Sequence, residues 1–296
     1  MIIHIPVLKK EVLEYLDPTP NENFIDCTIG EGGHTKLILE KSAPDGKVLG
    51  IDLDPAQIEN DKWQMADFKD RLILENSSYV NLKELIEKNN FGQVNGILLD
   101  LGMSSVHLDK STKGFSFQLD QSLDMRYDDR LNDLTAEKII NEWPEERIAK
   151  IIEEYGEEKF ARKIAKKIIE ERKRGRIKGT FQLVKIIKEV VPARAQSGKI
   201  HCATRTFQAL RIAVNAELEN VERVLPEVVS VLSPGGRLVV ISFHSLEDRI
   251  VKNFFNQQSK EGLIKILTKK PITAETKELG ENPRSRSAKL RAAIKL

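Results

Sequence analysis

Two features near the N-terminus could bind a nucleoside ligand. A glycine cluster runs from Gly30 to Gly33 and is followed by His34, and Asp52 lies 22 residues beyond Gly30. Residues without a β-carbon allow a ligand to approach the backbone closely. A carboxylate at this offset is placed to accept hydrogen bonds from both ribose hydroxyls of an adenosine cofactor. Asp54 is an alternative acid, but its position just before a proline suits a helix N-cap.

The spacing of the glycines disfavours a dinucleotide. The fingerprint GxGxxG, read from Gly30, would need glycine at position 35, where the chain has Thr35. S-adenosylmethionine needs no diphosphate cradle, only a glycine-lined approach for its amino acid portion and an acid for its ribose. The residues therefore favour S-adenosylmethionine as the cofactor. A nicotinamide oxidoreductase, and a tight turn that binds nothing, are the alternatives.

The surrounding elements predict where these residues lie. Short apolar runs at 23–28, 47–52, 72–74 and 96–100 alternate with helical segments. This repeat, at a spacing of about 25 residues, predicts an α/β fold with a parallel sheet covered by helices on both faces. Ligands of such sheets bind outside the carboxyl ends of the strands. Gly30, Asp52 and Asp100 all fall at such ends.

The alternating pattern is interrupted and then resumes. From about Val106 to Thr204 we predict no strand, and apolar residues recur instead at helical spacing. Strands are predicted again at 237–243, 263–267 and 288–296. We therefore expect a sheet domain of residues 1–105 and 205–296, with residues 106–204 inserted as a helical subdomain.

The composition is that of a globular protein, with 40% hydrophobic and 31% charged residues. No apolar run approaches the roughly 20 residues needed to cross a bilayer, and the N-terminus lacks the pattern of a secretory signal. These features predict a cytoplasmic protein that does not associate with membranes. Cys27 and Cys202 have no partner spacing and the five histidines are scattered, so we expect neither disulfides nor a metal site.

Charge is strongly segregated along the chain, although the formal net charge is only +2. Residues 120–158 contain 13 acidic and 5 basic residues, whereas residues 159–211 contain 16 basic and 3 acidic residues. A basic block of this density attracts a polyanion such as RNA through phosphate neutralisation. We expect the inserted subdomain to recognise RNA, and a solvated helix face is the alternative.

Seven motifs, in order, resemble those of the ribosomal RNA small subunit methyltransferase H family. They are residues 26–34, 100–105, 114–117, 123–126, 203–211, 241–249 and 282–287, and the resemblance runs from His4 to the C-terminus. It implies a class I S-adenosylmethionine-dependent methyltransferase, with a Rossmann-like, mostly parallel sheet and an inserted helical subdomain. The implied reaction transfers a methyl group to N4 of a cytidine in the decoding region of 16S ribosomal RNA. The implied partner is that RNA, within the small ribosomal subunit.

The resemblance also implies a set of cofactor contacts. These are Gly32, Gly33, His34, Asp52, Tyr79 and Asp100. A further family contact is usually a glutamine, and His107 occupies its position here and could still donate a hydrogen bond.

Methylation of a cytosine amine requires orientation and an acceptor for an amine hydrogen. We assign this acceptor to Asp100 with Ser104 or Ser105, at the end of the fourth strand. As alternatives, the serines cap a helix and Asp100 serves the cofactor alone. Phe115, Phe117 and Phe243 are candidates to receive a flipped base, with core packing as the alternative. The residues assigned to RNA binding are Arg126, Arg205, Arg211, His244, Arg249, Arg284 and Arg286.

Two further interpretations remain open. Cys202, beside His201 and Arg205, could act as a thiolate that adds to C6 of a pyrimidine, so that C5 is methylated. A non-catalytic RNA-binding or assembly protein would explain the basic block without a cofactor.

Overall fold

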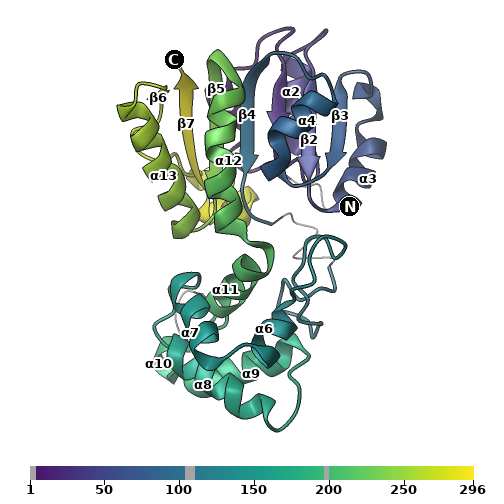
Figure 1. The fold of residues 1–296 in the computed structure, drawn as a ribbon. Coiled ribbons are helices and arrows are strands. Elements are labelled where there is room, and N and C mark those ends of the chain that lie inside the picture. Colours follow the sequence, from purple (N-terminus) through teal and green to yellow (C-terminus); the bar gives the residue numbers. More distant parts are fainter. Residues whose placement is uncertain (1–4, 104–110, 197–199) are drawn as a thin grey trace. The chain divides into compact units, whose positions relative to one another are not determined.

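The computed structural model describes residues 5–103, 111–196 and 200–296 and divides the chain into two compact units. The first unit, here the sheet unit, contains residues 1–102 and 218–296, and the second, the helical unit, contains residues 103–217 (Figure 1).

The sheet unit contains a seven-stranded sheet in the order β3-β2-β1-β4-β5-β7-β6. Strands β1 to β5 are parallel, and β7 runs antiparallel to both β5 and β6. This arrangement confirms the predicted mostly parallel sheet. The strands are β1 (Phe24–Asp26), β2 (Val48–Asp52), β3 (Leu72–Asn76), β4 (Val94–Asp100), β5 (Leu232–Ser242), β6 (Ile264–Ile266) and β7 (Lys289–Lys295).

Helices cover the sheet and enclose two apolar clusters (Figure 1). Successive strand residues point to opposite faces, so in β1 Ile25 belongs to one cluster and Phe24 to the other. The helices of this unit are α1 (Lys9–Leu16), α2 (Gly33–Lys41), α3 (Pro55–Gln64), α4 (Leu82–Lys88), α12 (Glu217–Val231), α13 (Ser245–Lys260) and α14 (Thr276–Glu281).

Two local features of this unit are the N-cap of α3 and the irregular first part of β5. Asp54 is the N-cap of α3, and its carboxylate accepts a 2.8 Å hydrogen bond from the amide of Ala56, as the sequence predicted. The segment Ser233–Gly236 lies within β5. There the pairing of β5 with β4 shifts register, and Gly235 has a φ of +80°, a conformation that favours glycine.

The helical unit contains six helices in its described residues. They are α6 (Ala136–Glu142), α7 (Glu145–Glu154), α8 (Ala161–Arg172), α9 (Thr180–Val190), α10 (Ala193–Gln196) and α11 (Thr204–Asn215). We expected residues from 205 onward to return to the sheet domain, whereas the structure groups α11 with the helical unit. The reason is packing, because Phe207 and Leu210 of α11 share one apolar core with Ile148 of α7.

Thr180 lies at the start of α9. The N-cap of α9 is Gly179, and Thr180 is the first helical residue. The buried Thr180 hydroxyl donates a 2.8 Å hydrogen bond to the carbonyl of Leu119 and accepts one of 3.1 Å from the amide of Gln121. Thr180 therefore anchors a distant loop to α9.

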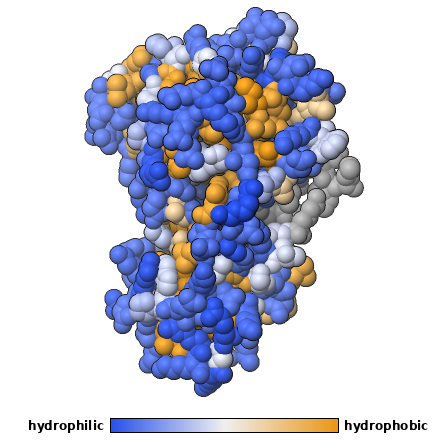
Figure 2. Space-filling model, turned by 45° about the vertical axis from the view of Figure 1, so that its right-hand side comes forward, coloured by the Kyte–Doolittle hydropathy of each residue, from blue (hydrophilic) through white to orange (hydrophobic). Residues whose placement is uncertain are grey.

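Among the described residues, no helix is both long enough and apolar enough to span a bilayer. Figure 2 shows a face on which hydrophobic side chains form patches separated by hydrophilic ones.

Candidate active site

Asp52 holds the glycine loop at the carboxyl ends of β1 and β2. Its Oδ2 accepts a 2.9 Å hydrogen bond from the amide of Gly30, and its Oδ1 accepts one of 2.8 Å from the amide of Asp54. An ionised carboxylate offers about four acceptor positions, so Asp52 retains capacity for ligand hydroxyls. Because Asp54 uses its own carboxylate to cap α3, Asp52 is the better-placed acid of the two.

Glycine is favoured at positions 30, 32 and 33 of the loop for different structural reasons. Gly30 and Gly32 have φ values of +55° and +70°, which disfavour other residues. Among the described residues, a β-carbon on Gly30 would meet only the carbonyl oxygen of Thr28, at 3.8 Å, so these residues leave space beside Gly30. A β-carbon on Gly32 would lie 2.5 Å from Cε of Met65, and one on Gly33 would lie equally close to Cγ of Pro6. A side chain at position 32 or 33 would therefore force Met65 or Pro6 to move.

Asp26, at the end of β1, is a buried carboxyl group that sequence reasoning did not single out. Its Oδ2 accepts a 2.7 Å hydrogen bond from the hydroxyl of Thr35, and its Oδ1 accepts one of 3.2 Å from the amide of Thr28. Burial raises the pKa of Asp26 from 3.8 to about 6, although these hydrogen bonds oppose the shift. The sequence signal that could have identified Asp26 is an acid at the end of a strand, four residues before Gly30. Thr35, where the dinucleotide fingerprint would need glycine, is therefore a partner of Asp26.

Asp100 ends β4, the strand beside β1. Its amide donates a 2.7 Å hydrogen bond to the hydroxyl of Thr28, which ties β4 to the segment after β1. Its Oδ1 is buried and has no hydrogen-bond partner in the described residues, while Nε2 of His34 lies 3.7 Å from its Oδ2. Burial, followed by the charges of Asp26 and Glu247, raises the pKa of Asp100 well above its usual range. An orphaned polar atom at a strand end fits a site completed by a ligand.

The segment that carries Tyr79 follows β3 and is joined to the end of β2. The side-chain amide of Asn76 donates 3.0 Å hydrogen bonds to the carbonyls of Asp52 and Leu53. The amide of Ser77 donates another, of 3.1 Å, to the carbonyl of Asp52. Tyr79 then begins a short 3-10 helix. The predicted cofactor residues Gly32, Gly33, His34, Asp52, Tyr79 and Asp100 therefore all lie at or just past strand ends on one edge of the sheet.

Three predicted site residues, Ser104, Ser105 and His107, lie outside the described residues. Their expected roles as proton acceptors and as a cofactor contact stay predictions.

Two of the arginines assigned to RNA have strong partners within the helical unit. Arg126 forms a two-pronged ion pair with Asp124, at 2.7 and 2.8 Å, and donates to the carbonyl of Asn132. Arg211 forms a similar pair with Glu217, with both hydrogen bonds at 2.8 Å, and both side chains are about 10% exposed. These guanidinium groups are occupied, so their geometry favours a supporting role over direct phosphate contact.

His244 is the N-cap of α13 in the sheet unit. Its Nδ1 accepts a hydrogen bond from the amide of Glu247, and the Glu247 carboxylate accepts hydrogen bonds from the amides of Phe243 and His244. This reciprocal capping box gives His244 a structural role at the start of α13.

The remaining arginines of the set differ in exposure. Arg249 and Arg286 are exposed, whereas Arg205 and Arg284 are half-buried. Arg205 also donates a 3.1 Å hydrogen bond to the carbonyl of Glu157.

Internal partners also engage much of the basic block. Arg172 donates to the carbonyls of Ile140 and Trp143, and Arg174 pairs with Glu171. Arg176 pairs with both Glu137 and Glu142, at 2.6 and 3.0 Å, so acids of the preceding segment neutralise part of the block. The segregation of charge along the sequence is therefore reduced by folding.

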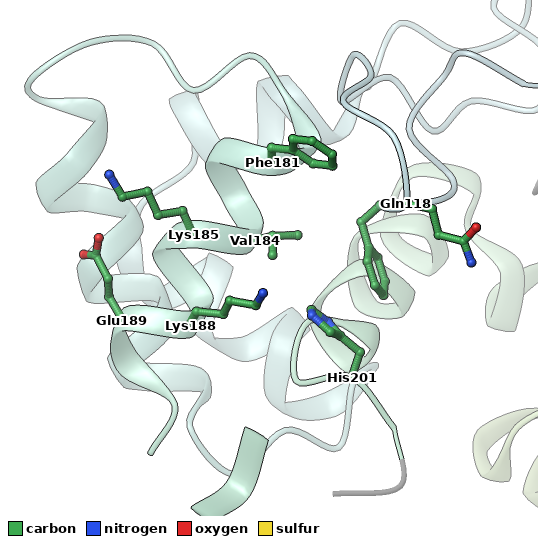
Figure 3. A pocket seen from close by; sticks show the side chains of 8 residues that line it. Gln118, Phe181, Val184, Lys185, Lys188, Glu189 and His201 are labelled. Atoms are coloured by element: carbon green, nitrogen blue, oxygen red, sulfur yellow. The ribbon is translucent and has the colours of Figure 1, made fainter. Parts of the chain in front are cut away.

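A pocket of about 610 Å³ lies within the helical unit (Figure 3). Its lining combines aromatic and basic side chains. In Figure 3, Phe181, Val184 and Lys188 point from α9 into the pocket, which His201 borders from the opposite side. The full lining is Phe117, Gln118, Phe181, Val184, Lys185, Lys188, Glu189 and His201.

The aromatic rings of this pocket differ in exposure and role. The Phe117 ring lies 4.8 Å from that of His201 and 4.9 Å from that of Phe207, measured between centroids. Phe181 is 49% exposed, which is unusual for a large apolar side chain. Burial and the charge of Lys188 lower the pKa of His201. Sequence reasoning missed this site, although positions 181, 184, 185 and 188 share the helical spacing of one face.

The other candidate aromatic residues and the two cysteines pack against other parts of the protein. Phe115 is buried and stacks on Tyr127, with ring centroids 5.3 Å apart, and the Phe243 ring packs over Gly102. Cys202 is half-buried against the core of the helical unit. Burial raises the pKa of the Cys27 thiol well above its usual range, so Cys27 is not a nucleophile.

The sheet order, the antiparallel β7 between β5 and β6, and the carboxyl groups at the ends of β1, β2 and β4 define a class I S-adenosylmethionine-dependent methyltransferase. The glycine loop without a dinucleotide fingerprint is consistent with this class. The chain belongs to the MraW methylase family, whose sequence profile matches residues 1–296.

Individual relatives agree with this family. The chain is 45% identical over 309 residues to ribosomal RNA small subunit methyltransferase H of Heliobacterium modesticaldum, covering 99% of this chain and 98% of the relative. It is 48% identical over 293 residues to the protein of the same name from Thermotoga neapolitana, covering 98% and 95%. A crystal structure of a putative rRNA-methylase from Clostridium thermocellum is similar in fold, with a TM-score of 0.50 at 12% identity and coverage of 99% and 100%. The family contradicts the alternative of a nicotinamide oxidoreductase.

Proposed function

We propose that the protein transfers a methyl group from S-adenosylmethionine to N4 of a cytidine in the decoding region of 16S ribosomal RNA. The observation that supports this most is the placement of Gly30, Asp52 and Asp100 at neighbouring strand ends, joined through hydrogen bonds. The relatives named ribosomal RNA small subunit methyltransferase H support the choice of substrate.

The cofactor would be held by groups at this edge of the sheet. Asp52 would accept the ribose hydroxyls, and the open space beside Gly30 would admit the amino acid portion. Gly32, Gly33, His34, Tyr79 and Asp100 complete the proposed contacts, with His107 as a further donor. When bound, S-adenosylmethionine supplies an electrophilic methyl group.

An oxygen of Asp100 would accept a hydrogen from the reacting amine. The lone pair of the cytosine N4 amine is delocalised into the ring, so an in-line orientation of the reacting groups is needed and can contribute about 7 to 11 kcal/mol. An oxygen that accepts an amine hydrogen would draw the nitrogen toward tetrahedral geometry. Asp100 has an oxygen without a hydrogen-bond partner among the described residues, and this oxygen would accept the amine hydrogen. Ser104 or Ser105 would share this role.

The helical unit would recognise the RNA. Its pocket offers aromatic rings for base stacking and the amino groups of Lys185 and Lys188 for phosphates. Arg205, Arg249, Arg284 and Arg286 are the proposed phosphate contacts, while Arg126, Arg211 and His244 would support the segments around them. The substrate would be 16S ribosomal RNA within the small subunit, which places the protein in the cytoplasm.

Mass mapping of the product tests this function. Small subunits that lack the modification are incubated with the protein and isotopically labelled S-adenosylmethionine, and the labelled nucleoside is identified. We expect N4-methylcytidine in the decoding region. Label on C5 would favour the Cys202 mechanism, and RNA binding without label would indicate a non-catalytic protein.

Two variants separate these outcomes. Asp100→Ala removes both side-chain oxygens, the proposed acceptor among them, and should abolish most methyl transfer. Because Asp100 is also a proposed cofactor contact, the rate is compared at saturating S-adenosylmethionine. Cys202→Ala should transfer methyl groups at the wild-type rate, because no step of the N4 reaction uses a thiol.

A further inference from the structure

Helix α3 carries a buried acid that no role above explains. Asp61 is 0% exposed, and neither of its carboxylate oxygens has a hydrogen-bond partner in the described residues. A buried polar group without a partner costs free energy, so a native structure that retains one usually completes it by other means.

Asp61 lies directly against the glycine loop. A β-carbon placed on Gly32 would be 3.2 Å from Oδ1 of Asp61, beside the sulfur and methyl group of Met65. Ile29, Ile58 and Met65 form a small apolar cluster between this loop and α3. The side chain therefore reaches the loop in apolar surroundings, where electrostatic interactions are weakly screened.

Within the described part of the chain, the charged groups that shift the pKa of Asp61 are all acidic. They are Asp26 at the end of β1, Asp52 at the end of β2 and Glu31 in the loop. Asp26 and Asp52 accept hydrogen bonds from loop residues, whereas Asp61 accepts none and forms no ion pair within the described part of the chain. Burial, followed by these three charges, raises the pKa of Asp61 from 3.8 to about 8. At neutral pH the carboxyl is therefore mostly protonated, and an added positive charge nearby would favour its ionised form.

We propose that Asp61 is a specificity-determining residue that favours the cationic methyl donor over its neutral-sulfur product. The inference rests on the proposed binding of S-adenosylmethionine at this loop. The sulfonium charge of the donor favours ionised Asp61, and the proton leaves to solvent. S-adenosylhomocysteine lacks that charge, so its binding releases fewer protons from Asp61 and its affinity increases less. Asp61 would thereby help the product to leave after each turnover.

The sign of the pH dependence follows from this linkage. Affinity for the donor rises with pH wherever binding lowers the pKa of a group, up to the pKa of the free protein, near 8 for Asp61. The ratio of donor to product affinity should therefore rise between pH 6.5 and 8.5, by about sixfold if donor binding lowers the pKa of Asp61 by about one unit. Asp26, with a pKa of about 6, and Asp100 also titrate, so only the difference from a variant at position 61 isolates Asp61.

Calorimetry in two buffers of different ionisation enthalpy measures the protons released on binding. At pH 7.5 the wild type should release more protons with S-adenosylmethionine than with S-adenosylhomocysteine. In Asp61→Asn, which keeps the side-chain shape and removes the charge, this difference should largely disappear and the affinity ratio should lose its added pH dependence. Asp67→Asn removes an exposed acid just beyond α3 and should behave as the wild type.

The outcomes separate the two proposals. Equal proton release with the two ligands in the wild type overturns the role of Asp61, even if Asp61→Asn does not fold. A wild-type difference that Asp61→Asn retains in full overturns it as well. If neither ligand binds the wild type, the proposed cofactor itself is wrong, and the inference fails with it.

Discussion

The hydroxyl of Thr35 donates a 2.7 Å hydrogen bond to Oδ2 of Asp26, and both residues are buried. This contact joins the first turn of α2 to the end of β1, on the two sides of the glycine loop. Replacing Thr35 by valine keeps the volume but removes the donor. We expect a loss of about 1 to 3 kcal/mol in the free energy of unfolding, measured by urea denaturation. Thr35→Ser should retain most of the stability, and an unchanged Thr35→Val would show that the bond contributes nothing.

The raised pKa of Asp26 predicts a pH dependence of stability. Because the pKa is about 6 in the folded protein and 3.8 otherwise, the folded state holds its proton more tightly. This contribution to stability is fully present below pH 3.8 and is lost as the pH rises through 6. It amounts to about 3 kcal/mol. The free energy of unfolding of the wild type, relative to that of Asp26→Asn, should therefore be larger at pH 4 than at pH 7. Parallel profiles for the two proteins would contradict the shift.

Asp52 should be required for cofactor affinity. Asp52→Ala removes the acceptor proposed for the ribose and frees the amide of Gly30, so we expect binding of S-adenosylmethionine to weaken by about 1 to 3 kcal/mol. Isothermal titration calorimetry measures this. Asp54→Ala is the matched control, because it removes only the N-cap of α3 and should cost about 1 kcal/mol of stability with little change in affinity. Equal affinities of wild type and Asp52→Ala would remove Asp52 from the site.

The buried pair of Arg211 and Glu217 should stabilise the helical unit. Arg211→Met leaves Glu217 as an uncompensated buried charge, which costs about 3 to 5 kcal/mol. The double variant Arg211→Met with Glu217→Leu should recover most of that loss. Arg174→Met breaks an exposed pair with Glu171 and should cost at most about 1 kcal/mol. Chemical denaturation of the three variants tests the ranking.

The pocket of the helical unit should contribute to RNA affinity. Phe181→Ala and Lys188→Ala should weaken binding, and Lys188→Ala should also lower the slope of affinity against salt by about 0.7 to 0.9 if Lys188 contacts one phosphate. Phe181 is half exposed, so its loss should change stability little. Arg176→Gln is the control, because Glu137 and Glu142 already neutralise Arg176. Filter binding at several salt concentrations measures all three, and wild-type affinity for both pocket variants would exclude the pocket.

The sequence alone determined the features that depend on neighbours along the chain. The alternation of strands and helices, the cap at Asp54 and the helical spacing of the inserted unit all follow from local patterns, and the structure confirms them. The motifs also sufficed to identify the family.

Only the tertiary structure decided which polar groups are paired and which are buried alone. Arg176 meets Glu137 from 39 residues away, and Thr180 meets Leu119 from 61 residues away, so neither pairing has a local signal. Asp26 and Asp61 look like ordinary acids in the sequence, yet burial raises the pKa of each. The membership of α11 in the helical unit also depends on which apolar faces meet. Burial and charge pairing are properties of the assembled packing, because they are set by residues that only folding brings together.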